Sequence, residues 1–580
     1  MLYGNKKYQY ANALAALLLS LLSCAGTAQT VQTGESEEQR RRARAEAAER
    51  ERLLNAPKVE LQGAAAAPDS LALPTESPCF AIDGFVLRVP EQLPAAARAA
   101  GASALPQDPF RFAQDYLAQY AGACIGKDGL NLIVKRLTAL ILAKGYSTTR
   151  LGIPAQDLSS RTLTLTLVPG LIHAIRFSSP AAAANWQNAF PTGPGRLLNL
   201  RDLEQGLEQM KRVPTQDVAM EIVPGDLPGE SDVVIEVKRV KPWKLTVSLD
   251  DSGAKGTGKL QAGANLAWDN ALGLNDLFNI GLNTDLERQG EQRGTTGGNV
   301  YYALPYGYWT FSVAASTYSY HQQIAGLFQT FVSSGKSRNL EFTVQQLVFR
   351  DQFQKHSWQF KVGKRWSRSY IDDSELEVQR RNTTFAELAW VHTRYIGDAQ
   401  LNLTLANRWG VSWFNGQPDL EPRQPDAPTY RYTLQTLDAS LYAPFKLGGQ
   451  AFAYIGALRA QTTHSTLFLS DQFSIGNRYT VRGFDGEQTL AAERGVYLRN
   501  EIEMPLGQSR QALYVGLDAG RVFGPGAQTL LGDKMVGAAV GLRGSAAGLR
   551  YDMFAGWALV KPDGLKTATP SAGFSLSYQY

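Results

Sequence analysis

The sequence predicts a mainly β protein: a sixteen-stranded transmembrane antiparallel β-barrel preceded by two small α/β domains and an N-terminal helix. Across residues 243–580, apolar and polar residues alternate at period two, in stretches separated by Gly-containing turns. At roughly 21 residues per strand and turn, this part holds about sixteen strands, which lies within the range of bacterial outer-membrane barrels. After residue 30, no run approaches the ~20 apolar residues of a membrane helix.

Residues 1–28 have the composition of a secretory signal. Positively charged residues near the start precede the apolar stretch 13–22, and small residues ending at Ala28 provide a cleavage site. The alternative is a lipoprotein signal in which Cys24 is lipidated. In both cases the chain leaves the cytoplasm.

Residues 29–55 predict a charged helix without an apolar stripe to bury. Its charged residues form i,i+4 pairs in the favourable order, with each Glu before its Arg. The pairs include Glu37 with Arg41 and Glu46 with Arg50. Both a solvated tail and a helix lodged in a wet polar channel are consistent with this pattern.

Residues 56–77 are rich in Ala and Pro and predict a flexible linker. Two α/β domains are then expected, at 78–169 and 170–241. Their patterns repeat the order strand, helix, strand, strand. The expected helices are 110–120, 129–144 and 200–211, and the expected strands are 80–89, 147–153, 161–168, 172–177, 218–223 and 232–238.

Two cysteines, Cys79 and Cys124, remain if Cys24 leaves with the signal. An even pair in an exported chain favours a disulfide, which on the chain-entropy model would stabilise its domain by ~4 kcal/mol. No His lies near either cysteine, and two ligands do not make a zinc site. The sequence therefore predicts a Cys79–Cys124 disulfide and no metal site.

The long segment 461–493 lacks strand alternation and is expected to be a loop. An Arg beside Gly at its centre, followed two strands later by an Asp near Gly, suggests a loop folded into a cavity. There the guanidinium needs a carboxylate partner. A solvated surface Arg is the alternative. The residues expected at this contact are Arg482, Gly483, Phe484, Asp518 and Gly520.

The strand patterns favour a membrane barrel over a soluble β-propeller. Leucines in 401–406 alternate with Asn402 and Thr404, as expected when one face meets lipid and the other a wet lumen. In a bilayer, only a closed barrel satisfies every backbone donor and acceptor of its strands. The strict alternation over 574–580 suits a closing strand. A propeller needs a blade repeat, which the sequence does not show.

Several short motifs make the chain similar to the TpsB outer-membrane transporters of two-partner secretion, of the haemolysin secretion/activation type. Single motifs are weak, but their order and spacing together are specific to that family. They occupy residues 77–80, 124–126, 144–150, 154–158, 168–170, 273–276, 304–309, 481–484 and 518–520.

The resemblance implies a domain plan. Residues 78–169 and 170–241 would be two periplasmic POTRA domains, and residues 242–580 a sixteen-stranded barrel. Residues 29–55 would form a helix that plugs the pore. The long sixth extracellular loop would enter the lumen, where its Arg482 contacts Asp518 on the inner wall.

The resemblance also implies a function. Family members export one large, unfolded, β-helix-forming exoprotein of the TpsA type without ATP, and some activate it as a cytolysin. The POTRA domains would recognise this partner in the periplasm. The barrel, expected to be a monomer, would sit among outer-membrane lipid and lipopolysaccharide.

Other functional classes fit less well. An outer-membrane insertase of the same superfamily is the main alternative, because it shares the Arg-Gly-aromatic loop and POTRA domains. A passive porin has no use for two domains before its barrel. No nucleotide loop or catalytic triad is visible, and the five histidines lie on separate elements, so we expect no enzyme and no cofactor. A net charge of +5 over 580 residues is too dilute to imply nucleic acid.

Overall fold

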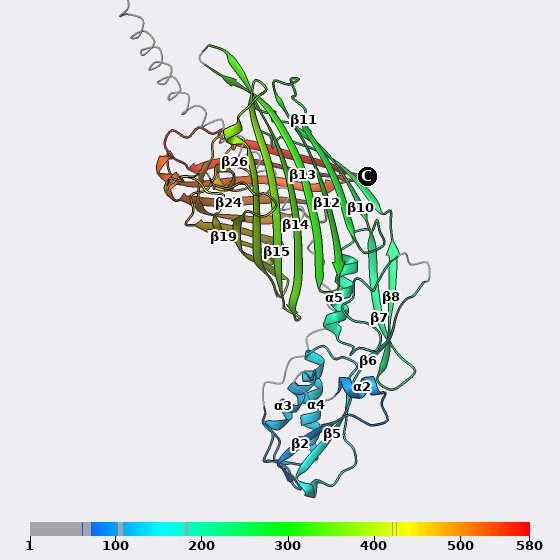
Figure 1. The fold of residues 1–580 in the computed structure, drawn as a ribbon. Helices are drawn as coiled ribbons and strands as arrows, with labels where there is room; N and C mark the ends of the chain where they lie inside the picture. Colours follow the sequence, from blue (N-terminus) through cyan, green and yellow to red (C-terminus); the bar gives the residue numbers. More distant parts are fainter. Residues whose placement is uncertain are drawn as a thin grey trace, which may run out of the picture.

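A computed structural model describes residues 61, 71–101, 108–179, 184–326, 328–419, 421–424 and 426–580. Two small α/β domains follow one another below a wide barrel (Figure 1). The predicted signal and the predicted N-terminal helix, with Glu37, Arg41, Glu46 and Arg50, lie outside the described residues. Among the residues described, no helix is both long and apolar enough to cross a bilayer.

The first α/β domain contains five short strands and three helices. Its elements are β1 (Phe80–Ile82), β2 (Gly84–Arg88), α2 (Ala95–Ala100), α3 (Arg111–Ala118), β3 (Ala123–Ile125), α4 (Lys127–Ala143), β4 (Arg150–Gly152) and β5 (Thr162–Val168). β5 pairs in parallel with β2 and antiparallel with β4. Apolar residues of α4 and β5, including Ile133, Leu137, Leu163 and Leu165, share one buried core.

The expected single strand over 80–89 is two strands. β1 pairs with β3, whereas β2 pairs with β5, so the chain changes sheets at Asp83. The backbone N–H groups of Asp83 and Gly84 both donate to the carbonyl of Arg161, which closes this corner. Just beyond it, Cys79 and Cys124 form the predicted disulfide, which ties the start of the domain to β3.

The second α/β domain has the predicted order strand, helix, strand, strand. Its elements are β6 (Leu171–Phe177), α5 (Leu200–Lys211), β7 (Gln216–Pro224) and β8 (Glu230–Arg239). β8 lies between β6, its parallel partner, and β7, its antiparallel partner. Asn199 begins α5 because its side chain accepts a hydrogen bond from the N–H of Arg201.

The predicted barrel is present and closed, since its last strand pairs with its first. It has sixteen long strands, all antiparallel to their neighbours, and a two-residue piece, β16 (Ser374–Glu375), on one hairpin. The strands are β9 (Trp243–Asp250), β10 (Gln261–Asp269), β11 (Leu277–Asp285), β12 (Gly294–Tyr306), β13 (Trp309–Ala325), β14 (Thr330–Arg350), β15 (Gln354–Ile371), β17 (Arg381–Ile396), β18 (Ala399–Val411), β19 (Thr433–Leu447), β20 (Gln450–Thr463), β23 (Arg494–Pro505), β24 (Gln511–Phe523), β25 (Lys534–Ala546), β26 (Leu549–Val560) and β27 (Ser571–Gln579).

One strand of the barrel, β12, shows no clear period-two alternation in its sequence. Glycines at 294, 297 and 298 remove side chains from its first half, and Pro305 lies near its end. These residues hide the period-two pattern. Pairing with β11 and β13 on both sides nevertheless holds the segment extended.

The two ends of the barrel differ. The second α/β domain contacts the end that carries short turns, such as the one at Gly307, whose N–H donates to the carbonyl of Asn188. The longer connections lie at the opposite end (Figure 1). Short 3-10 turns lie in these connections and in the first domain, at Leu158–Ser160, Glu377–Gln379, Leu469–Asp471 and Pro525–Thr529.

Candidate functional site

The loop between β20 and β23 packs against the inner wall of the barrel. Within it, β21 (Phe473–Ile475) pairs with β22 (Leu490–Ala492). Phe484 and Val481 from the loop centre join a buried core with Val522 of β24 and Met535 of β25. Because these apolar side chains are buried against the wall, the loop is packed inside the barrel and does not extend into solvent.

Arg482 lies at the centre of this loop and is almost fully buried, with 4% of its surface exposed. Its Nε and Nη2 donate to the two carboxylate oxygens of Asp518 at 2.7 and 2.9 Å. Its backbone N–H also donates to Asp518, at 3.0 Å, and its Nη2 donates to the carbonyl of Asn500 at 3.1 Å. Side chain and main chain are thus both bound to one carboxylate of the barrel wall.

Glu501 of β23 is a second carboxylate partner, which the sequence analysis missed. It accepts a hydrogen bond from Nη1 of Arg482, and another at 2.5 Å from Nη2 of Arg543. Arg543 in turn lies 3.2 Å from Glu503. Acidic residues on a strand give no local signal of such a contact, because their partners come from other strands.

Glycines on the wall allow the loop backbone to lie directly against the strands. A Cβ added to Gly537 would lie 1.8 Å from the carbonyl oxygen of Arg482, and one added to Gly556 would lie 2.8 Å from the backbone of Gly483. A Cβ added to Gly520 would lie 2.9 Å from Cγ2 of Val481, so this glycine makes room for a loop side chain. The five residues expected at this contact therefore lie together.

A second contact joins the loop to the seam between the first and last strands. Arg478 donates to the Asp251 carboxylate at 2.7 Å. The same carboxylate oxygen accepts the backbone N–H of Phe574 in β27 at 2.9 Å. Because Asp251 directly follows β9, this group links the loop to both strands at the seam.

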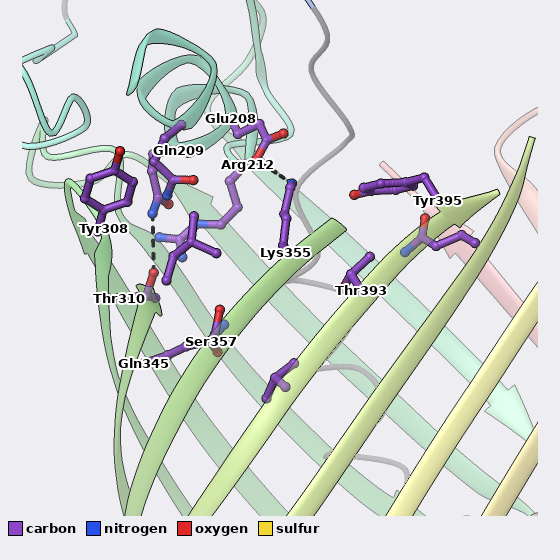
Figure 2. Close-up of a pocket in the computed structure, with 14 residues that line it drawn as sticks. Glu208, Gln209, Arg212, Tyr308, Thr310, Gln345, Lys355, Ser357, Thr393 and Tyr395 are labelled. Atoms are coloured by element: carbon purple, nitrogen blue, oxygen red, sulfur yellow. Dashed lines mark hydrogen bonds and ion pairs between the residues drawn. The ribbon is translucent and has the colours of Figure 1, made fainter. Parts of the chain in front are cut away.

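At the other end of the barrel, α5 lies between the sheet of its own domain and the strand ends of the barrel. Ten of its twelve residues are buried, including polar ones. Arg350 at the end of β14 lies 3.4 Å from Glu204 and 3.1 Å from Glu208. Lys355 of β15 contacts Glu208 at 2.6 Å (Figure 2). Buried cations and carboxylates therefore join the second domain to the barrel.

Amides and a phenol add uncharged contacts to this junction. The Nε2 groups of Gln205 and Gln209 both donate to the carbonyl of Gly307 at 3.2 Å. The hydroxyl of Tyr308 donates to Asp202. Burial raises the pKa of Asp202 above its usual value, although this hydrogen bond opposes the shift. The hairpin turn between β12 and β13 is thus held by one face of α5.

A polar cavity of about 130 Å³ lies between α5 and the inner wall of the barrel (Figure 2). Its lining includes Thr310, Ser357 and Thr393, together with Arg212 from the end of α5. Nε and Nη2 of Arg212 have no hydrogen-bond partner among the described residues. Burial lowers the pKa of Arg212 to about 10, which leaves the group charged at neutral pH. Among the described residues, this cation at the mouth of the lumen forms no ion pair with a carboxylate.

Two of the histidines lie next to each other in the barrel wall. His356 and His392 are cross-strand partners on β15 and β17, and their ring centroids lie 4.5 Å apart. Their neighbours Ser357 and Val391 line the inner cavity, so the two imidazoles point outward. Within the described part of the chain, no group of three or more His, Cys, Asp or Glu side chains could hold a metal ion.

Comparison with known proteins gives three family matches. Residues 229–544 match the haemolysin secretion/activation protein ShlB/FhaC/HecB, residues 97–170 match a POTRA domain of the ShlB type, and residues 171–224 match a POTRA domain.

Individual relatives agree with these matches. The chain is 46% identical over 540 residues to the outer membrane transporter CdiB-2 of Burkholderia pseudomallei, which covers 92% of each protein. It is 28% identical to the hemolysin transporter protein ShlB of Serratia marcescens, over 79% of this chain and 78% of the relative. The structure of CdiB from Escherichia coli has the same fold, with a TM-score of 0.81 over 95% of this chain and 98% of that one, at 24% identity.

Proposed function

Since the chain belongs to the ShlB/FhaC/HecB family of haemolysin secretion/activation proteins, we propose that it exports one large, unfolded exoprotein through its barrel. The protein is a transporter of the outer membrane, and its POTRA domains face the periplasm. We assign these domains to 78–169 and 170–241 and the barrel to 242–580. The family match favours transport over the insertase alternative.

The observation that carries this proposal is the loop packed inside a closed barrel. Its contact through Arg482, Asp518 and Glu501 is buried and has defined geometry. A chain can pass only if the contents of the lumen make room. We propose that this contact holds the loop in the position from which transport begins.

The exoprotein would first be captured in the periplasm. An extended segment can add as a strand to the edge of a POTRA sheet, where main-chain hydrogen bonds provide affinity. Such a segment would then reach the mouth of the barrel, which is lined by the hydroxyls and amides of the polar cavity beside α5. Folding of the exoprotein outside the cell would prevent its return, so that no ATP is needed.

Replacing the buried guanidinium tests the proposal. We expect Arg482→Ala to abolish export of the exoprotein while the barrel still inserts, because the buried Asp518 loses the guanidinium bound to both its oxygens and Glu501 keeps only Arg543. Arg521→Ala is the matched control, since Arg521 pairs with Asp533 in an exposed position on the same strand as Asp518. Secreted exoprotein and heat-modifiable barrel are measured together.

The outcomes separate two levels of the proposal. Normal export by Arg482→Ala would contradict the role of the contact but not transport itself. Failure of the wild type to export the product of a neighbouring exoprotein gene would contradict the transport function. Deleting residues 35–55 tests the expected plug: increased channel conductance supports it, and unchanged conductance argues against it.

A further inference from the structure

Four cations gather on the outer face of the barrel, away from the lumen and its loop. They are Lys336 and Arg338 on β14 and Lys364 and Arg368 on β15. These strands lie side by side in the wall of the barrel (Figure 1). Lys336 faces Arg368 directly across the strands, as two like charges. Such a pair is destabilising unless an anion lies between the charges.

Strand alternation shows that these side chains point outward. Gln345 and Ser357 line the inner cavity, so odd-numbered positions of this part of β14 and β15 face the lumen. Ser337 and Ser369, at odd positions, are buried, whereas Lys336 and Arg368 are exposed. The cations therefore lie on the lipid-facing surface of the wall.

Their height on the wall places them at a membrane boundary. Below them, the outward side chains of β15 are mainly apolar: Trp358, Phe360, Val362 and Trp366, with the buried Lys364 between the last two. Eight residues of strand span about 27 Å. With the usual tilt, this run fits the apolar band of an outer-membrane barrel and its aromatic borders. Arg368 follows Trp366 on the side away from the periplasmic domains, where the outer leaflet has its headgroups.

One carboxylate reaches the edge of this surface. Glu375 lies 2.7 Å from Arg380 and 4.0 Å from Arg368, so two cations share it. Between 334 and 342 and between 362 and 370, no outward position among the described residues carries Asp or Glu. The excess charge is therefore positive.

Lys364 is an unusual member of the group because it is 92% buried, with 8% of its surface exposed. Its Nζ donates to the carbonyl of Phe414 at 2.8 Å, and it lies 5.6 Å from the ring centroid of Trp366. A cation held by a carbonyl and a ring, and not by a carboxylate, adds to the local positive potential. The segment around Phe414, which is itself 73% exposed, covers it.

We propose that Lys336, Arg338 and Arg368 form a binding site for the phosphate groups of a glycolipid in the outer leaflet, such as lipid A. Guanidinium and ammonium groups are the common protein ligands of phosphate. The apolar surface below them matches the acyl chains of the same molecule, and a phosphate between Lys336 and Arg368 relieves their repulsion. This site rests on the outer-membrane location of the protein and not on the route of the exoprotein.

The test measures binding of bisphosphorylated lipid A to the full-length protein in detergent, by native mass spectrometry. The variant carries Lys336→Gln, Arg338→Gln and Arg368→Gln. Each of the three cations is expected to contribute to binding as a surface cation near an anionic leaflet does. The affinity of this triple variant for lipid A should therefore be roughly a hundredfold lower than that of the wild type. The matched control carries Lys446→Gln, Arg510→Gln and Arg550→Gln, which remove three exposed cations from strand ends and a turn at the periplasmic end. It should bind as the wild type does.

Two further arms identify the ligand chemistry. Dephosphorylated lipid A should bind the wild type no better than it binds the triple variant, and inorganic phosphate at millimolar concentration should not displace lipid A. Equal binding of bisphosphorylated lipid A by the wild type and the triple variant would overturn the proposal. So would binding of an acidic soluble peptide to this surface in competition with lipid A. Conductance of the variants checks that the barrel is intact.

Discussion

Each POTRA domain has a three-stranded sheet and a longest helix, α4 or α5, but these helices have different surroundings. In the first domain, α4 buries an apolar stripe of Ile133, Leu137 and Ile141 and leaves its polar residues outside the core. In the second domain, α5 buries Arg201, Glu204 and most of its other polar residues as well. The helix α4 therefore contributes to the core of its own domain, whereas α5 also connects its domain to the barrel.

The difference shows that each domain is stabilised by its own means. The first depends on a disulfide and an apolar core, and its contacts with the second domain include backbone hydrogen bonds such as that from Leu200 N–H to the carbonyl of Gly145. The second depends on buried charges supplied by the barrel, such as Arg350. Ions buried in this way are costly to separate, which holds the second domain in a defined orientation. We therefore expect the first domain to move more freely relative to the barrel than the second domain does.

The largest expected effect comes from the disulfide. Cys79→Ser with Cys124→Ser opens a link across 45 residues, and the chain-entropy model predicts a loss of about 4 kcal/mol from the first domain. Native-state hydrogen exchange of the full chain should show faster exchange in α4 and no change in α5. Equal acceleration of hydrogen exchange in α4 and α5 would mean that the two domains unfold together, which would contradict their separate stabilisation.

The converse experiment removes Arg350. Arg350→Ala leaves Glu204 and Glu208 buried with less positive charge, which should cost about 3 kcal/mol at the junction. Exchange should accelerate in α5 and remain unchanged in α4. Arg394→Ala, which removes an exposed arginine on β17, two strands from β14, is the control. Adding Glu204→Gln and Glu208→Gln should restore part of the loss; no restoration would argue against a charge effect.

A smaller effect concerns how the linker is attached to the first domain. Glu76 accepts backbone hydrogen bonds from Gly126, Asp128 and Gly129 at the start of α4. Burial alone would raise the pKa of Glu76, but these three donors lower it below the usual value. The stabilisation is therefore present above about pH 4.5 and lost as pH falls through the lowered pKa. Exchange in the first turn of α4 should rise roughly threefold on acidification, and Glu76→Gln should remove most of that pH dependence.

The smallest effect is expected at an exposed pair in the second domain. Asp232 accepts a hydrogen bond from His173, which raises the pKa of the imidazole. Its stabilisation is complete below about pH 6.5 and is lost as pH rises through the raised pKa. Because the pair is exposed, exchange in β6 should change less than about twofold. A large change that survives His173→Gln would point to another titrating group in this domain.

Much of the fold could be predicted because its signals are local. Period-two alternation predicted most barrel strands, and the apolar stripe of 200–211 predicted α5 with its observed bounds. The motif around Arg482 predicted a carboxylate partner, and Asp518 lies in contact with it. In contrast, the glycines and proline of β12 give no alternation, and pairing with neighbours on both sides makes it a strand.

Local order along the chain was thus sufficient to predict most strands and helices, because periodicity and turn chemistry act between near neighbours. The disulfide followed from the even cysteine count, and the residues of the loop contact from a motif. Charged partners on other strands that belong to no motif were not predictable. Glu501 reaches Arg482, and Arg350 reaches Glu208, only after the barrel has closed and set its register. The same register gathers Lys336 and Arg368 on the outer face. The sequence around a charged residue does not indicate its ion-pair partner, because strand pairing and burial determine which groups come into contact.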